Sequence, residues 1–485
     1  MPPAEHLPSR PGAEYRPGAE YLGDGRCRFL VWAPRRTSVE VVFQPPDARA
    51  IRLEPGDDGY HSALVESVWP RARYLLRLDG DVERPDPASR YQPEGVHGPS
   101  EVVDPSAFRW TDQAWRPPAL EDMVMYEAHT GTFSAEGTFA GIASRLDHLV
   151  DLGVNALDIM PVAQFPGARN WGYDGVDPYA VQGSYGGPEG LRALVDACHR
   201  RGVAVILDVV YNHLGPEGNY LEDFGPYFTG KYHTPWGSAV NYDGPWSDEV
   251  RTFFIENAHY WMLDFHVDAL RLDAIHGIYD ASAHPFLQQL AEETEALEEE
   301  TGRQLLLIAE SDLNDARIVT PAECYGYGID AQWSDDFHHS VHALLTGERS
   351  GYYRDFGSPE HLVRAIRDGY VFSGQHSAYR RRRHGNSPQA IRPNQLVVAI
   401  QTHDQVGNRM KGDRLGTLLD FEQQKVAAGL LLLSPSVPLL FMGEEYGETA
   451  PFLYFVDHSD KELSAMVRKG RAEEFKAFGW EEEPP

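Results

Sequence analysis

Short apolar runs alternate with amphipathic segments along most of the chain after residue 123. Continuous apolar runs of this length are typical of parallel strands that are buried on both faces, and the segments between several of them repeat apolar positions with a helical period. The runs occupy residues 124–129, 154–160, 203–210, 267–273, 305–310, 331–335, 397–404 and 437–443. About eight strand–helix units of this kind predict a closed (β/α)8 TIM barrel.

A doubly wound open sheet is the alternative interpretation of the same pattern. Such a sheet binds nucleotides through a glycine-rich turn directly after its first strand. The run at 124–129 is not followed by that fingerprint. The barrel is therefore the favoured architecture.

The first 118 residues follow a different pattern, with short strands separated by Gly, Pro and Asp turns. Strands are expected at 28–34, 38–43 and 72–78, and this spacing predicts a small immunoglobulin-like β-sandwich. A Pro-rich stretch at 84–105 reads as a linker that wraps onto the next domain.

These patterns divide the chain into three parts. We expect a sandwich with its linker at 1–118, a catalytic barrel at 119–478 and an acidic tail at 479–485. Two long insertions interrupt the barrel, at 214–246 and 352–394. The first is rich in Gly, Pro and aromatic residues, so it is expected to form a sizeable loop structure over the strand ends.

Composition excludes several classes of protein. The net charge of −30 leaves no basic footprint for nucleic acid, and the isolated run at 380–383 reads as a solvated cluster. No apolar run is long enough to span a bilayer, and the N-terminus lacks a signal pattern. Cys27, Cys198 and Cys324 are scattered, so neither a disulfide framework nor a metal cluster is indicated. We expect a cytoplasmic monomer that acts on a neutral, hydroxyl-rich substrate.

Three acidic residues carry the candidate chemistry. Asp273, Glu310 and Asp404 each close one of the apolar runs. In a barrel, the carboxyl ends of the strands meet at one face and point side chains into one pocket. Retaining hydrolysis of a glycoside needs two acids about 5 Å apart, and neighbouring strands lie at about that spacing. The three acids therefore predict glycosidic-bond chemistry.

Arg271 precedes Asp273 by two residues, so both side chains project to the same side of the strand. A cation in a packed barrel needs an acidic partner, and Arg271 is expected to keep Asp273 ionised as a nucleophile. A structural ion pair is the alternative interpretation. Glu310 follows an apolar stretch, and desolvation together with neighbouring acids is expected to raise its pKa, as an acid/base requires.

Two histidines and an aromatic segment lie beside these acids. His213 and His403 stand at strand ends, where imidazole groups bind sugar hydroxyls, whereas most of the 20 histidines are expected to be structural. The segment NWGY at 170–173 offers an aromatic face for stacking a pyranose ring. Because Trp171 lies in a loop between Asn and Gly, it is not expected to belong to the core.

Four short blocks resemble the α-amylase superfamily of glycoside hydrolases. They are DVVYNH at 208–213, LRLD at 270–273, IAE at 308–310 and THD at 402–404. The resemblance implies Asp273 as nucleophile, Glu310 as acid/base and Asp404 as the residue that grips the distorted sugar. The supporting positions that it implies are Asp208, His213, Arg271, His403 and, for stacking, Tyr173.

Longer blocks narrow the resemblance to the maltooligosyltrehalose trehalohydrolase family. They lie at 211–220, 234–243, 330–339 and 452–460. Members release trehalose from the end of maltooligosyl trehalose by cutting the neighbouring α-1,4 bond, so this substrate and related glucan oligosaccharides are the expected partners. The expected contacts to the leaving trehalose are His276, Trp333, Asp335 and Asp336. Neither a metal nor a cofactor is expected.

One departure and two alternatives accompany this resemblance. The family usually carries a small C-terminal β-domain, and this chain stops soon after its last predicted helix, so we expect a shortened chain or a member without that domain. An uncovered apolar flank of the barrel is then expected. A glycogen branching enzyme would share the sandwich, the barrel and the acids but would transfer the glucan to a sugar hydroxyl. A non-catalytic glucan-binding barrel would lack at least one of the three acids.

Overall fold

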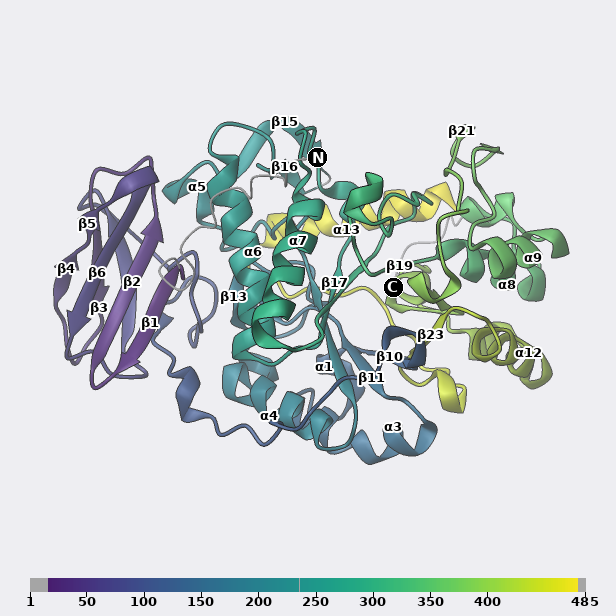
Figure 1. The fold of residues 1–485 in the computed structure, drawn as a ribbon, viewed down its shortest axis with the longest axis horizontal. Helices are drawn as coiled ribbons and strands as arrows, with labels where there is room; N and C mark the ends of the chain where they lie inside the picture. Colours follow the sequence, from purple (N-terminus) through teal and green to yellow (C-terminus); the bar gives the residue numbers. More distant parts are fainter. Residues whose placement is uncertain (1–15, 235, 479–485) are drawn as a thin grey trace.

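A closed parallel barrel forms the centre of the computed structural model, which describes residues 16–234 and 236–478 (Figure 1). In order around the barrel, the strands are β10 (Met125–Ala128), β11 (Ala156–Ile159), β14 (Ala204–Val209), β17 (Ala269–Leu272), β18 (Leu306–Ala309), β19 (Ala331–Trp333), β22 (Leu396–Ala399) and β23 (Val437–Phe441). Each strand pairs in parallel with the next, and β23 pairs with β10 to close the ring. The predicted (β/α)8 barrel is confirmed.

The barrel interior changes from apolar to charged along the strands. Because side chains alternate between faces, residues two apart on one strand point to the same side. Five inward apolar residues are each followed two positions later by a charged one: Met125 by Glu127, Ala156 by Asp158, Ile206 by Asp208, Ala269 by Arg271, and Ile308 by Glu310. The amino end of the barrel is thus a dry core, and its carboxyl end is a polar layer.

The three predicted acids lie on two different kinds of secondary structure. Asp273 and Glu310 directly follow β17 and β18. Asp404 lies instead in the first turn of α10 (His403–Gly407), because β22 already ends at Ala399. Thr402 caps that helix by accepting a hydrogen bond from the Asp404 backbone N–H at 3.3 Å. The prediction of one strand over 397–404 is therefore wrong in its second half, where a capping Thr starts a helix.

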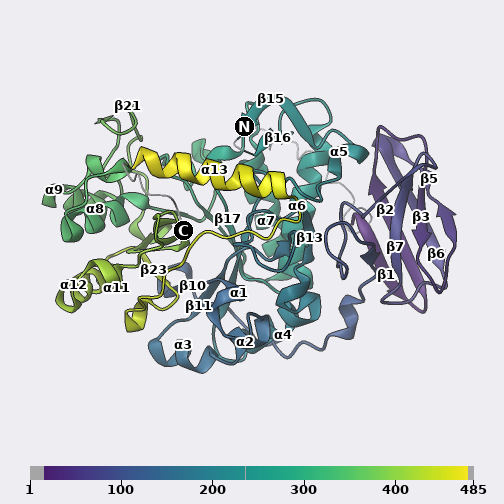
Figure 2. The same cartoon turned by 180° about the vertical axis from the view of Figure 1, so that it is seen from behind.

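Helices surround the barrel. The main ones are α3 (Leu146–Leu152), α4 (Gly187–His199), α6 (Ser247–Asp264), α7 (Phe286–Thr301), α8 (Asp335–Thr346) and α12 (Phe421–Leu432). The final helix, α13 (Lys461–Ala477), runs from the vicinity of α6 towards α9 (Pro359–Asp368) (Figure 2). Arg471 of α13 donates hydrogen bonds to Asn408 and to the carbonyl oxygen of Gly407. This last helix is therefore fastened to the same segment that carries Asp404.

Two antiparallel sheets form the N-terminal part and lie to one side of the barrel (Figure 1). One sheet has the order β1 (Gly18–Gly23), β2 (Arg26–Trp32), β6 (Tyr60–Glu66) and β5 (Glu54–Pro55); the other has β4 (Ala50–Arg52), β3 (Val39–Phe43), β7 (Arg73–Leu78) and β8 (Val82–Arg84), with β9 (Ser100–Glu101) paired to β7. The ring of Phe29 packs edge-on against Phe43 and Tyr74 of the facing sheet. The two sheets therefore share one core, as a β-sandwich does.

The sandwich packs on the first insertion, which contains α5 (Leu221–Phe224), β15 (Phe228–Thr234) and β16 (Gly237–Val240). The ring of Trp32 meets Tyr227 edge-on with 5.0 Å between centroids. Asp223 accepts a hydrogen bond from Arg84 Nε on its side chain (2.6 Å) and another from Arg36 on its carbonyl oxygen. The insertion is thus held against the barrel by the N-terminal sheets.

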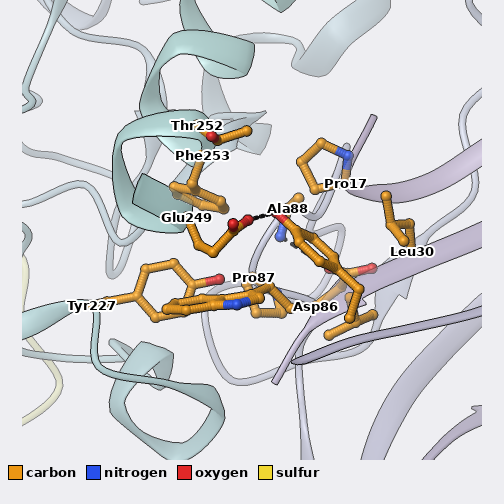
Figure 3. Close-up of a pocket in the computed structure, with 12 residues that line it drawn as sticks. Pro17, Leu30, Asp86, Pro87, Ala88, Tyr227, Glu249, Thr252 and Phe253 are labelled. Atoms are coloured by element: carbon orange, nitrogen blue, oxygen red, sulfur yellow. Dashed lines mark hydrogen bonds between the residues drawn. The ribbon is translucent and has the colours of Figure 1, made fainter. Parts of the chain in front are cut away.

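A narrow pocket marks this junction (Figure 3). Glu249 of α6 points into it and accepts a hydrogen bond from the Tyr60 hydroxyl of the sandwich. Tyr227 and Phe253 line the barrel side of the pocket. The interface therefore combines aromatic packing with a buried polar contact.

Two further observations complete the fold. Within residues 16–234 and 236–478, no helix is long and apolar enough to cross a membrane. The predicted acidic tail at 479–485 lies outside the described residues.

We predict that Trp32→Ala destabilises the protein and loosens the sandwich from the insertion. The side chain is 4% exposed and contacts Tyr227, so its removal leaves a cavity that costs about 3–5 kcal/mol. Thermal unfolding measures the loss. Trp69→Ala on the same sandwich is the matched control, because Trp69 is 60% exposed and its removal is expected to change the free energy of unfolding by less than about 0.5 kcal/mol. Equal losses in the two variants would contradict the packing role of Trp32.

Candidate active site

One buried guanidinium lies among three carboxylates at the carboxyl end of the barrel. Arg271 Nη1 donates to Asp208 Oδ2 and to Asp273 Oδ1, both at 2.8 Å. Arg271 Nη2 lies 3.5 Å from Glu310 Oε2. Asp208 lies on β14, and Asp273 and Glu310 directly follow β17 and β18, so the parallel ladder brings the three acids to one point.

Asp273 is held ionised by the donors around it. Burial alone would raise its pKa, but Arg271, His213 and a hydrogen bond from Asn212 together lower the pKa below its ordinary value. Asn212 Nδ2 donates to both the Asp273 carboxylate and its carbonyl oxygen at 2.7 Å. An ionised carboxylate in a fixed orientation is what a nucleophile requires.

Glu310 has the opposite tendency. Burial raises its pKa above the ordinary value, Asp273 and Asp404 raise it further, and Arg271 and His276 oppose the shift. The backbone N–H of Ala274 donates to Glu310 Oε2 at 2.7 Å. Ala274 is in the left-handed region, with φ of 38°, which is a strained conformation for a residue with a side chain. The turn after Asp273 therefore orients Glu310.

Two neighbouring acids whose pKa values move apart can divide the work of acid and nucleophile. The arrangement of Asp273 and Glu310 on adjacent strands therefore suits covalent glycoside hydrolysis. Asp208, the third acid on Arg271, has its pKa raised to about 7 by burial and by Asp273, against the effect of Arg271.

Asp404 faces this cluster from α10. Its side chain is 42% exposed, which makes it the most open of the three predicted acids. Asn408 Nδ2 donates to Asp404 Oδ1 at 3.2 Å, and His403 Nε2 lies 3.5 Å from the same oxygen. The carboxylate is thus oriented within its helix and still open to a ligand.

The Tyr173 hydroxyl connects the two sides of the site. It donates to Asp208 Oδ2 at 2.7 Å and lies 2.8 Å from His403 Nε2. The ring is half-buried and stacks on His403 with 5.2 Å between centroids, so one part of it remains available to a sugar ring. Tyr173, Asp208 and His403 were all predicted site residues, and the structure brings them into contact.

Glu127 is a residue of the site that the sequence did not predict. This residue lies on β10, and its carboxylate is 2.5 Å from His403 Nδ1 and accepts a hydrogen bond from the His403 backbone at 2.9 Å. Burial would lower the pKa of His403, but Asp404 and Glu127 raise it to about 9. A glutamate two positions after an inward apolar residue of a buried strand was the signal available in the sequence.

The expectation for Trp171 is wrong. Its side chain is buried, stacks on Phe452 and donates from Nε1 to the carbonyl oxygen of Leu453 at 3.0 Å. The ring lies directly against Gly407 of α10, where a Cβ atom would stand 2.0 Å from it. Gly172 follows with φ of 112°, and this left-handed turn lets Trp171 enter the core while Tyr173 faces the site.

His213 supports Asp273 from the side of the first insertion. Its Nε2 lies 2.9 Å from the carbonyl oxygen of Tyr173, and its ring stacks on Trp236 with 3.8 Å between centroids. Both contacts use the imidazole for positioning. Trp236 is about half exposed and belongs to the insertion, which the sequence had placed over the strand ends.

The four predicted leaving-side residues differ in position. His276 is exposed and close enough to influence the pKa of Glu310, and Asp335 begins α8 near Glu310 and Asp404. Trp333 is buried and lies against the Arg271 guanidinium, 4.5 Å from its ring centroid. Asp336 is also buried.

The Asp336 carboxylate accepts hydrogen bonds from other groups of the protein. Its Oδ2 accepts hydrogen bonds from the backbone of Val371 and Phe372 and from Asn314. Trp333 and Asp336 are buried and contact other protein groups, which favours a supporting role over the predicted direct contact with trehalose. His276 follows β17, Trp333 ends β19, and Asp335 and Asp336 follow it. These positions in the sequence do not reveal which side of a turn or helix points inward.

The comparisons with known proteins agree with this geometry. The α-amylase catalytic domain model matches residues 103–234. The chain is 51% identical over 453 residues to a malto-oligosyltrehalose trehalohydrolase of Saccharolobus solfataricus, covering 93% of this chain and 79% of that protein. It is 46% identical over 459 residues to the enzyme of the same name from Arthrobacter ramosus, covering 94% and 79%.

The chain belongs to the malto-oligosyltrehalose trehalohydrolase family. It is accordingly a glycoside hydrolase of the α-amylase superfamily. A branching enzyme of Bacillus cereus is more distant, at 29% identity over 456 residues, covering 87% of this chain and 66% of that protein.

Solved structures agree on the fold. A crystal structure of a Salmonella typhimurium protein matches with a TM-score of 0.90 at 41% identity, covering 96% of this chain and 80% of that one. A Bacillus subtilis pullulanase matches with a TM-score of 0.70 at 20% identity, covering 96% and 72%, and shows likeness of fold alone.

We predict that Glu127→Gln lowers stability and weakens its dependence on pH. The raised pKa of His403 means that charging this residue stabilises the fold fully below pH 6.5, and that this stabilisation is lost as the pH rises through about 9. Breaking a buried charge pair costs about 3–5 kcal/mol.

Chemical unfolding between pH 6 and 10 measures both effects. The wild-type free energy of unfolding should fall across this range more steeply than that of the variant. Glu300→Gln, on the exposed side of α7, is the control and should follow the wild type. Parallel curves for Glu127→Gln and the wild type would refute the role of the Glu127–His403 pair.

Proposed function

We propose that this enzyme hydrolyses, with retention of configuration, the α-1,4 bond next to the terminal trehalose of maltooligosyl trehalose. The products are trehalose and a maltooligosaccharide. The observation that carries the proposal is the position of Asp273 and Glu310 around Arg271 at the ends of adjacent strands. The pKa of Asp273 is lowered there, whereas burial and the neighbouring acids raise the pKa of Glu310. The names of the relatives supply the substrate.

In the first step, the Glu310 carboxyl protonates the oxygen of the scissile bond while the Asp273 carboxylate attacks the anomeric carbon. Trehalose leaves with that oxygen, and the glucan is bound to Asp273 as an ester. Arg271 keeps Asp273 ionised until it attacks. Glu310 is suited to carry the proton because burial and the two neighbouring acids raise its pKa.

In the second step, the Glu310 carboxylate takes a proton from water, and the water oxygen attacks the same anomeric carbon. The ester bond to Asp273 breaks, and the maltooligosaccharide is released with its original configuration. Both residues return to their starting protonation states. The nucleophile and the acid/base of both steps are thus side chains at the ends of barrel strands.

The other residues hold the sugar that is attacked. We assign Asp404 to hydroxyl groups of the distorted ring, because its carboxylate is open and oriented. Tyr173 stacks on that ring, and His403, His213 and Asp208 orient Tyr173 and Asp273 or bind hydroxyl groups at the rim. A cluster with many fixed acceptors and donors suits a neutral polyol.

His276 and Asp335 are the candidate contacts to the leaving trehalose. His276 is exposed three residues after Asp273, and Asp335 lies beside Glu310 at the start of α8. Trp333 and Asp336 act behind them, by supporting Arg271 and the segment at 371–372. A glycogen branching enzyme remains the alternative, and the lower identity to such an enzyme favours the trehalohydrolase.

Product analysis tests the reaction. We expect the wild type to release trehalose from maltotriosyl trehalose much faster than it cuts maltopentaose, and Asp273→Asn to lose activity by a factor on the order of 10⁴ or more. Asp147→Asn, at an exposed position, is the control for fold and charge. Equal cutting of both substrates would indicate a general amylase, and new α-1,6 branches without free trehalose would indicate a branching enzyme.

We predict that Asp404→Asn moves the alkaline limb of the pH profile of kcat/KM to lower pH. The negative charge of Asp404 raises the pKa of Glu310, so its removal makes Glu310 lose the required proton at lower pH. The measurement is kcat/KM on maltotriosyl trehalose from pH 4 to 9. An alkaline limb at unchanged or higher pH in this variant, with Asp147→Asn like the wild type, would contradict Glu310 as the acid.

A further inference from the structure

Glu217 is a half-buried residue whose carboxylate joins the first insertion to two distant parts of the chain. Its Oε2 accepts a hydrogen bond from the Ser459 backbone at 3.0 Å and lies 3.2 Å from His458 Nδ1. The Ser459 hydroxyl donates to Oε1, and His97 Nε2 of the linker lies 3.6 Å from that oxygen. The side chain of Glu217 is only 8% exposed. These donors lower its pKa below the ordinary value despite its burial.

The segment that Glu217 binds, at 452–460, also holds the back of the Tyr173 loop. Leu453 accepts a hydrogen bond from Trp171 Nε1, and Asp457 Oδ2 accepts one from the Ala168 backbone, both at 3.0 Å. Tyr454 packs against the Trp171 ring with 5.0 Å between centroids. The position of the loop therefore depends on the position of this segment.

The insertion holds the same loop from the other side. The Gly215 backbone N–H donates to the carbonyl oxygen of Gly175 at 3.0 Å, and His213 Nε2 lies 2.9 Å from the carbonyl oxygen of Tyr173. Three segments, at 168–175, 213–217 and 452–460, thus contact one another in pairs. Glu217 contacts Ser459 and His458 and thereby connects segment 213–217 to segment 452–460.

We propose that Glu217 is a positioning residue that sets the place of Tyr173 in the sugar site. It fastens segment 452–460 to the insertion, and the two together fix the loop that presents Tyr173 to Asp208 and His403. This role rests on the proposed function, because Tyr173 is there assigned to stack on the attacked sugar. Glu217 acts through the loop and takes no part in the proton transfers.

The sharpest structural test is hydrogen exchange of the amides at 167–176. Glu217→Ala removes the acceptor for Ser459, so these amides should exchange at least about fivefold faster, although the contacts described for Glu217 are with Ser459, His458 and His97. Glu222→Ala is the matched control, because Glu222 is an exposed glutamate of the same insertion. Unchanged exchange at 167–176 in Glu217→Ala would overturn the inference.

Kinetics on maltotriosyl trehalose separate positioning from stability. A misplaced stacking ring weakens binding of substrate and transition state alike, so KM should rise about tenfold in Glu217→Ala while kcat changes less than about threefold. Glu217→Gln keeps one acceptor oxygen and should recover most of the loss. A lower kcat with unchanged KM and a lower Tm would mean that Glu217 only stabilises the fold.

The wild-type assay separates this inference from the proposed function. If the wild type released no trehalose, the proposed function would fail, and the exchange comparison would still decide whether Glu217 fixes the loop. If the wild type were active and Glu217→Ala matched it in KM and in exchange, the proposed function would stand and the inference would fail.

Discussion

The candidate active site depends on the guanidinium of Arg271 inside the barrel. Arg271 lies where the apolar core ends and the charged layer begins, and its guanidinium contacts acids from three neighbouring strands. Without it, the carboxylates of Asp208, Asp273 and Glu310 would repel one another in a buried environment. The Trp333 ring packs against the Arg271 guanidinium and fixes the position of that group. This side chain thus makes the acid cluster compatible with a packed barrel, while burial and the neighbouring acids keep the pKa of Glu310 raised against the effect of Arg271.

Support for this layer comes from parts of the chain that are far apart in sequence. Glu127 on β10 raises the pKa of His403 and so favours its protonated form. The Tyr173 hydroxyl contacts both His403 and Asp208. The insertion contributes the stacking of Trp236 on His213, and it is itself held by the N-terminal sheets. Each of these contacts restricts the motion of a residue in the candidate site, and such restriction is the condition for electrostatic preorganisation.

The barrel could be predicted from the sequence because each strand is a continuous apolar run, and a run of this kind has few alternatives once helices separate it from the next. Asp273 and Glu310 could be placed because they end such runs. The predicted position of Asp404 was less accurate, since an apolar run does not reveal that Thr402 starts a helix. The burial of Trp171, Trp333 and Asp336 could not be predicted, for a common reason. Burial of these side chains depends on Phe452, Arg271 and the 371–372 backbone, which are contacts between distant segments.

Asp273 and Glu310 follow barrel strands, whereas Asp404 lies in a short helix. This difference has a consequence for which parts of the site can change through substitutions. The spacing of Asp273 and Glu310 is set by backbone hydrogen bonds of the β17–β18 ladder, including those from Glu310 N–H to Leu272 and from Ile275 N–H to Glu310. Backbone bonds do not depend on side-chain identity, so this spacing survives changes in the loops. Asp404 is carried by a five-residue helix whose cap, neighbours and packing against Trp171 are all side-chain contacts. Substitutions around Asp404 can therefore change the sugar contacts proposed for this residue, while the backbones that carry Asp273 and Glu310 stay the same distance apart.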